Sequence, residues 1–219
     1  MHLLYSLVSG PLAWFAFAVF IGGSIWKIAT LANLAKKKDN AVYEYWSLDH
    51  AMASIFHWLA PFGSRNWRLN PVMTVVTFTF HFCLLLVPLC LAAHVILWKE
   101  SFDIAWMTIP DGLADYMTMA VIAGAGFFIY RRRTRPDVAF LTSRSDYILL
   151  AITVAPFITG FWAAHQWFGY RLMYILHVFS GEVWLVAIPF TRLSHAILFV
   201  FTRGYMGSEF GAVRHARDY

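Results

Sequence analysis

Four histidines lie inside segments apolar enough to cross a membrane. His81 and His94 share one such segment, and His177 and His195 share another. A polar group is costly in hydrocarbon, so it marks a functional site or a paired side chain. Imidazoles from two facing helices can bind a haem iron from both sides of the porphyrin. The four residues therefore predict two bis-histidine haem sites. The alternative is a set of histidines that only hydrogen-bond between helices.

The spacing of the histidines tests this prediction. His177 and His195 are 18 positions apart, a whole number of turns at about 100° per residue, so one continuous helix would present both on one face. The rise of about 1.5 Å per residue separates them by about 27 Å, close to the thickness of the hydrocarbon layer. His81 and His94 are 13 positions apart and point about 140° apart on an ideal helix. This pair therefore needs the kink that Pro88 predicts.

Composition places this chemistry in a membrane. Of 219 residues, 60% are hydrophobic and 13% are charged, whereas soluble domains average about 25% charged. The two cysteines form no CxxC motif, which argues against iron–sulfur ligation and a c-type haem. The net charge of +5 comes from short basic runs beside apolar spans, so it indicates contact with anionic lipid rather than nucleic acid.

The predicted fold class is all-α: an integral membrane bundle of five transmembrane helices in a single domain, residues 1–219. Each predicted span reaches the length of about 20 residues that a bilayer requires. The spans are about 11–34, 71–98, 113–130, 147–168 and 172–201. The segment at about 43–60 is predicted to be a helix in the membrane interface. Its His50 and His57 share one face and are alternatives to His81 as the inner haem ligand.

Basic residues predict the orientation of the bundle. They concentrate in the first and third loops and at the C-terminus, while the second and fourth loops carry one each. The positive-inside rule then places the N-terminus outside and the C-terminus in the cytoplasm. With the second and fifth helices antiparallel, His94 pairs with His177 near the outer surface. His81 pairs with His195 near the inner surface.

Five further residues are candidates for binding a cofactor. Arg192 could pair with a haem propionate, or simply anchor the interface. Glu182 could carry a quinol proton or orient a histidine, or pair with another helix. Gly181 could let a porphyrin approach the backbone, or allow close helix packing. His165 and Tyr116 could line an outer quinone pocket.

Three segments resemble a known family. The motif "PFTRLSH" at 189–195, with the tail "FTRGYMGSEFGAVRHAR", resembles the last helix and tail of the respiratory nitrate reductase gamma subunit. The stretch "YRRRTRPDVAFLTSRSDYILL" at 130–150 resembles the third connection of that subunit, and "FHFCLLL" at 80–86 resembles the start of its ligand helix. The family consists of five-helix, two-haem b-type cytochromes. The resemblance implies haem ligands on the second and fifth helices, which are the helices that carry the four histidines.

Some features depart from the nitrate reductase subunit. The two histidines on the second helix are 13 residues apart, farther than in that subunit, and the first loop is also longer than its counterpart there. The stretch "IPDGLADY" offers no equivalent of the lysine that the family uses near its quinol site. The sequence is more similar to membrane cytochrome b subunits of sulfate-reducer redox complexes, such as the high-molecular-weight cytochrome complex. This resemblance implies a bacterial inner-membrane subunit, with other membrane subunits as neighbours. It would link a periplasmic multihaem cytochrome c or menaquinone to a cytoplasmic iron–sulfur subunit in anaerobic respiration.

Three alternatives remain open. The alternatives to a dihaem subunit of this kind are a haem-free anchor of such a complex, a nitrate reductase gamma subunit that oxidises quinol, and a transporter with an intramembrane proton relay. The transporter is disfavoured because the five spans show no internal repeat and no pair of broken helices.

Overall fold

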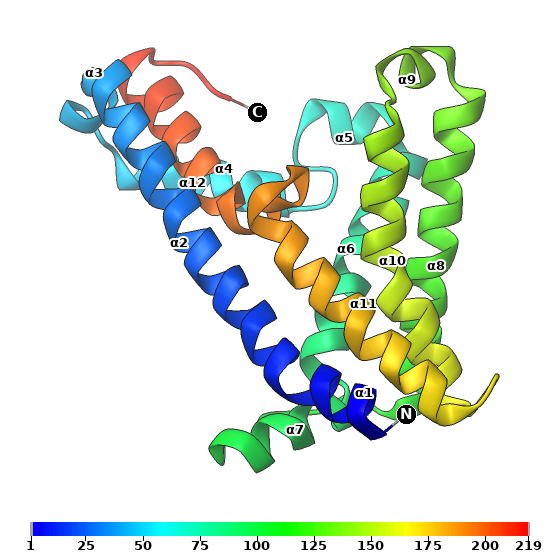
Figure 1. The fold of residues 1–219 in the computed structure, drawn as a ribbon. Coiled ribbons are helices and arrows are strands. Elements are labelled where there is room, and N and C mark those ends of the chain that lie inside the picture. Colours follow the sequence, from blue (N-terminus) through cyan, green and yellow to red (C-terminus); the bar gives the residue numbers. More distant parts are fainter. Residues whose placement is uncertain (1, 219) are drawn as a thin grey trace. The chain divides into compact units, whose positions relative to one another are not determined.

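The structure is a computed structural model that describes residues 2–218, and it is helical throughout that range apart from short connections (Figure 1). The all-α prediction is confirmed. Five helical segments are long and apolar enough to cross a membrane: Leu3–Lys38, Pro71–Cys90, Asp111–Thr134, Arg144–Ala164 and Tyr170–Phe190. The one β-type pairing among the described residues is an isolated bridge between Leu91 and Ile109.

The elements follow one another along the chain with short connections. In order they are α1 (His2–Leu7), η1 (Val8–Leu12), α2 (Ala13–Lys38), α3 (Asn40–Glu44), α4 (Leu48–Leu59), α5 (Arg65–Leu69), α6 (Pro71–Cys90), α7 (Ala92–Phe102), α8 (Asp111–Thr134), α9 (Pro136–Leu141), α10 (Arg144–Ala164), α11 (Tyr170–Phe190), η2 (Arg192–Ser194), α12 (His195–Ser208) and η3 (Glu209–Val213).

The predicted second span, 71–98, is broken rather than kinked. Helix α6 continues through Pro88 and ends at Cys90, and Leu91 is extended with φ −64° and ψ 132°. The connection before α8 closes the break: the Ile109 amide donates to the Cys90 carbonyl at 2.9 Å, and the Trp106 indole donates to the Leu89 carbonyl at 2.7 Å. His94 therefore belongs to the separate helix α7.

The predicted fifth span, 172–201, is also interrupted, which corrects the argument from a shared helix face. Pro189 lacks the N–H for a helical hydrogen bond, α11 ends at Phe190, and Thr191 is extended. The Thr191 hydroxyl donates to the Ala187 carbonyl and accepts from the Leu193 amide. His195 thus begins α12, so its 18-residue distance from His177 is not a whole number of turns along one helix.

The chain divides into two compact units. Unit 1 contains the chain up to Ser9 together with Val75–Gly181, and unit 2 contains Gly10–Thr74 together with the chain from Glu182. In unit 1, α8 and α10 run side by side and α9 joins them at one end (Figure 1). Helix α6 approaches α8 closely at Gly124, where an added Cβ would lie 3.0 Å from the Phe80 ring.

Unit 2 is organised around the crossing of α4 and α12. Gly207 permits this crossing, because an added Cβ would lie 2.5 Å from the His50 carbonyl oxygen. The Ser54 hydroxyl donates to Asp218 at 2.5 Å, and Arg203 pairs with the same carboxylate at 3.7 Å. The predicted interfacial segment, 43–60, contains α4, which exposes apolar side chains such as Phe56 on the side away from its buried Ala51 and Ser54.

Candidate metal centre

Unit 1 brings His94 and His177 together, the two residues predicted to bind the outer haem. Their ring centroids are 5.9 Å apart and their ring planes differ by 4°. Rings stacked directly over one another would have centroids about 3.5–4 Å apart, so these two rings are not in that register. Metal–nitrogen bonds of about 2.0–2.1 Å, with about 1 Å more to each ring centre, give a centroid separation of about 6 Å. The spacing matches two imidazoles that share one metal ion.

Hydrogen bonds define which nitrogen of each ring is available. Nδ1 of His94 lies 2.8 Å from the Pro88 carbonyl oxygen, and Nδ1 of His177 lies 2.8 Å from the Pro156 carbonyl oxygen. A carbonyl can only accept, so both Nδ1 atoms carry the hydrogen, and in the neutral imidazole each Nε2 then keeps a lone pair. Metal-binding histidines are commonly oriented in this way by a carbonyl on their second nitrogen.

The break in the second span explains the bond to His94. Because α6 ends at Cys90, the carbonyls of its last turn lack helical donors. The Pro88 carbonyl is one of them, and the imidazole N–H of His94 occupies it from the first turn of α7. Pro88 was expected to align His94 with His81 through a kink. Instead, it supplies the acceptor that orients the His94 ring.

Gly160 lets His177 reach its acceptor on α10. A Cβ added at Gly160 would lie 2.8 Å from both Cε1 and Nδ1 of His177, a distance that no side chain tolerates without displacement. Beside this contact, Thr159 and Ser180 hydroxyls lie 3.2 Å apart and link α10 to α11. Sequence reasoning missed Pro156 and Gly160. Their motif, "PFITG", gives no signal until the packing of α10 against α11 is known.

The other two predicted ligands show the same hydrogen-bond pattern. Nδ1 of His81 is 2.8 Å from the Thr77 carbonyl oxygen, and Nδ1 of His195 is 2.8 Å from the Arg192 carbonyl oxygen. Each ring therefore also carries its hydrogen on Nδ1. His81 belongs to unit 1 and His195 to unit 2, so their pairing at an inner haem stays a prediction.

His165 and His50 are bonded differently. His165 lies at the end of α10, where its Nε2 is 3.2 Å from Asp115. His50 shares a hydrogen bond with the Ser47 hydroxyl. Tyr116, predicted with His165 to line a quinone pocket, is 71% exposed. The bonding to a backbone carbonyl through Nδ1 thus distinguishes the four predicted ligands from His50 and His165.

Three more residues were predicted to bind a cofactor: Gly181, Glu182 and Arg192. The chain passes from unit 1 to unit 2 between Gly181 and Glu182. Glu182 is 6% exposed, and neither carboxylate oxygen has a hydrogen-bond partner among residues 2–218. Gly181 beside it has open space where a Cβ would stand. Arg192 is exposed in η2, three residues before His195. Their roles with a cofactor stay predictions.

No group of three or more His, Cys, Asp or Glu side chains gathers anywhere in the described part of the chain. A site that binds a metal ion through protein side chains alone is therefore not visible there. Bis-histidine haem is different, because the porphyrin supplies the other ligands of the iron and the protein supplies only two. The parallel pair of His94 and His177 fits this requirement.

Comparison with known proteins gives the family of the chain. A protein from Nitratidesulfovibrio vulgaris (strain Hildenborough) is 35% identical over 215 residues, covering 96% of this chain and 95% of the relative. The chain belongs to the family of that protein. The name of the N. vulgaris relative, "Protein", states no activity, so membership of this family does not by itself assign a function. No family model and no solved structure matches the sequence.

Proposed function

We propose that the chain is the dihaem b-type membrane subunit of a respiratory redox complex in the bacterial inner membrane. It would carry electrons between a periplasmic cytochrome c or menaquinone on one side and an iron–sulfur subunit on the cytoplasmic side. The parallel arrangement of His94 and His177, with both Nδ1 atoms bonded to carbonyls, is the observation that carries this proposal. The five apolar helices support the membrane setting.

In this proposal the protein orients two nitrogen ligands and excludes water. The Pro88 and Pro156 carbonyls hold the imidazoles of His94 and His177 with their Nε2 lone pairs available. Haem would supply the one-electron chemistry, with a potential that depends on its axial ligands and on its surroundings. Gly160 leaves room for the His177 ring beside α10.

The inner haem of the proposal would be bound by His81 and His195. Arg192 is exposed beside His195, which suits a guanidinium that pairs with a propionate. Basic residues in the first and third loops and in the C-terminal tail support a cytoplasmic C-terminus and an external N-terminus. The pair of His165 with Asp115 would then lie near the outer surface, where a quinol proton could be accepted.

A haem-free membrane anchor is the second candidate. One observation favours it: the bond of His177 to Pro156 joins α11 to α10, as expected of a histidine that only connects helices. That function gives no reason for two parallel imidazoles at 5.9 Å. A haem shared between the rings does.

The deciding experiment is a reduced-minus-oxidised spectrum of the purified full-length protein, with haem quantified per chain. We expect a b-type α-band and two haems. His94→Ala and His177→Ala should each retain one haem, whereas His165→Ala, which changes a histidine bonded to Asp115, should retain both. A wild-type protein without an α-band would establish the anchor. Two haems in both His94→Ala and His177→Ala would refute the pairing.

A further inference from the structure

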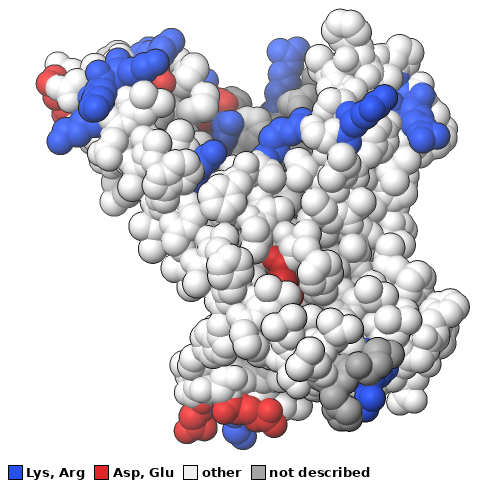
Figure 2. Space-filling model, viewed as in Figure 1, with Lys and Arg blue, Asp and Glu red and all other residues white. Residues whose placement is uncertain are grey.

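A cavity of about 400 Å³ lies in unit 1 where α8, α9 and α10 meet. Arg131 and Arg132 from the end of α8 line it together with Asp137 and Leu141 of α9 and Asp146 of α10. Two membrane-length helices have their ends here, α8 at Thr134 and α10 at Arg144. Figure 2 shows Lys and Arg side chains at this end of the unit and mostly uncharged residues along the middle of the helices. The cavity therefore lies where lipid headgroups would be when α8 and α10 cross a bilayer.

Two positive charges in this cavity lack an anion. Arg131 and Arg132 are half-buried, and neither forms an ion pair with any acid between residues 2 and 218. A guanidinium withdrawn from water is costly unless an anion or acceptor compensates for it. Its planar N–H groups fit the oxygens of a carboxylate or phosphate best.

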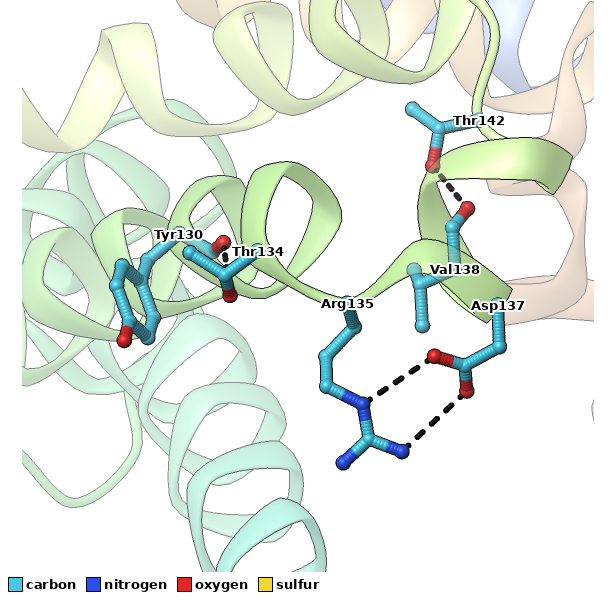
Figure 3. Close-up of polar contacts among 6 residues, drawn as sticks. All are labelled: Tyr130, Thr134, Arg135, Asp137, Val138 and Thr142. Carbon is cyan, nitrogen blue, oxygen red and sulfur yellow. Dashed lines mark hydrogen bonds and ion pairs between the residues drawn. The ribbon is translucent and has the colours of Figure 1, made fainter.

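The two acids of the cavity are already engaged with other groups. Asp137 accepts two hydrogen bonds from Arg135, at 3.2 Å from Nε and 3.5 Å from Nη2 (Figure 3). The hydrogen bond from Arg135 also holds the pKa of Asp137 below its ordinary value. Asp146 accepts from the Ser143 amide at 2.7 Å and from the Ser143 hydroxyl at 2.8 Å, as the cap of α10. Neither acid is therefore arranged to neutralise Arg131 and Arg132.

The short helix α9 adds an apolar surface next to these charges. Phe140 is 89% exposed and Leu141 is 79% exposed, an unusual degree of exposure for side chains of this size. In a membrane such side chains contact acyl chains, and basic groups at the same depth attract anionic headgroups. An anion with a hydrocarbon tail satisfies both features together.

We propose that the cavity binds the phosphate of an anionic phospholipid, with Arg131 and Arg132 on the phosphate oxygens and Phe140 and Leu141 against the acyl chains. This proposal does not depend on haem or on electron transfer. Arg133 serves as a matched control, because it belongs to the same basic run but is exposed and does not line the cavity.

The test is native mass spectrometry of the full-length protein released from mixed micelles of phosphatidylglycerol and phosphatidylcholine. We expect the wild type and Arg133→Gln to retain one phosphatidylglycerol. Arg131→Gln with Arg132→Gln should lower its occupancy by about tenfold, the equivalent of about 1.4 kcal/mol. Equal retention by the double variant, or an equal loss in Arg133→Gln, overturns the proposal.

A second variant and a second ligand complete the test. Phe140→Ser with Leu141→Ser changes only exposed side chains and leaves the arginines in place, and it should also lower retention of phosphatidylglycerol. Unchanged retention in this variant overturns the role of the acyl chains. Phosphatidylglycerol should raise the thermal midpoint of the wild type, and inorganic phosphate at millimolar concentration should not. If phosphate alone raises it equally, the site binds soluble phosphate and the lipid proposal is wrong.

Discussion

The rings of His94 and His177 lie within 4° of parallel although they come from separate helices. Each ring is fixed at Nδ1 by the carbonyl of a proline, Pro88 for His94 and Pro156 for His177. Two acceptors on two different helices thus define the orientation of the pair. Because protein carbonyls fix both rings, a haem bound between them as proposed would lose little free energy in ordering its ligands.

Under the proposed function, Gly160→Ala should abolish haem binding between His94 and His177. The new methyl group would lie 2.8 Å from the His177 ring, so the imidazole must move away from its ligating position. Alanine is otherwise favoured over glycine in a helix by about 0.5–1 kcal/mol, so the loss would not arise from a weaker helix. Haem content and the α-band of the purified variant measure the effect.

Gly126→Ala is the matched control for that substitution. Gly126 also lies inside a membrane-length helix, and an added Cβ would meet nothing within 4 Å. We expect the haem content of Gly126→Ala to equal that of the wild type. Full haem content in Gly160→Ala would contradict the position assigned to His177.

Glu182→Leu should raise the free energy of unfolding by about 1–3 kcal/mol. Glu182 is buried, and its carboxylate oxygens have no partner among the described residues. Replacing an uncompensated buried acid with an apolar side chain removes the cost of its desolvation. Thermal unfolding in detergent provides the measurement. A less stable or haem-depleted variant would instead reveal that the carboxylate binds a cofactor, a quinone or another subunit.

Gly207→Ala should destabilise unit 2 by about 1–3 kcal/mol, the usual cost of overpacking. Its Cβ would lie 2.5 Å from the His50 carbonyl oxygen and 2.5 Å from the Ser54 Cβ, and the backbone of α4 cannot move aside cheaply. Gly22→Ala is the control, since a Cβ there meets nothing within 4 Å. Thermal unfolding followed by circular dichroism compares Gly207→Ala with Gly22→Ala. Equal unfolding midpoints for the two variants would disprove the close crossing of α4 and α12.

Tyr205→Phe should lower stability by about 1 kcal/mol at neutral pH. Partial burial and the hydrogen bond that the hydroxyl donates to Asp39, at 2.6 Å, raise the pKa of Tyr205 above its ordinary value. The folded state thus favours the protonated phenol. The advantage of the wild type is complete below the unfolded pKa of about 10 and is lost as the pH rises above it.

Unfolding by denaturant at pH 7, 9, 10.5 and 11.5 checks this pH dependence. The difference between the wild type and Tyr205→Phe should shrink only above pH of about 10. Tyr45→Phe, which changes an exposed tyrosine, should show no such difference. A gap that widens with rising pH would contradict the bond to Asp39.

The helical class and the five apolar segments could be predicted because hydrophobic length is a property of the sequence itself. The breaks at Leu91 and Thr191 could not. Both lie in apolar runs. The first is closed by donors distant in sequence, Ile109 and Trp106, and the second is stabilised locally by the Thr191 hydroxyl, whose hydrogen bonds an apolar pattern does not reveal.

The antiparallel order of the second and fifth spans predicts that His94 lies near His177, and the structure places these residues together. An unbroken fifth helix was the basis for relating His177 to His195, and that helix ends at Phe190. Pro156 and Gly160 act through packing between α10 and α11, and a sequence read span by span carries no information about that packing.

The break at Leu91 couples the orientation of His94 to the connection between α7 and α8. Residues 103–110 are tied to the last turn of α6 through the bonds from Trp106 and Ile109. The same turn supplies the carbonyl that orients His94. A protein that docks on this connection would therefore shift the His94 imidazole through these hydrogen bonds, and a haem bound there as proposed would report the docking as a change in its redox potential.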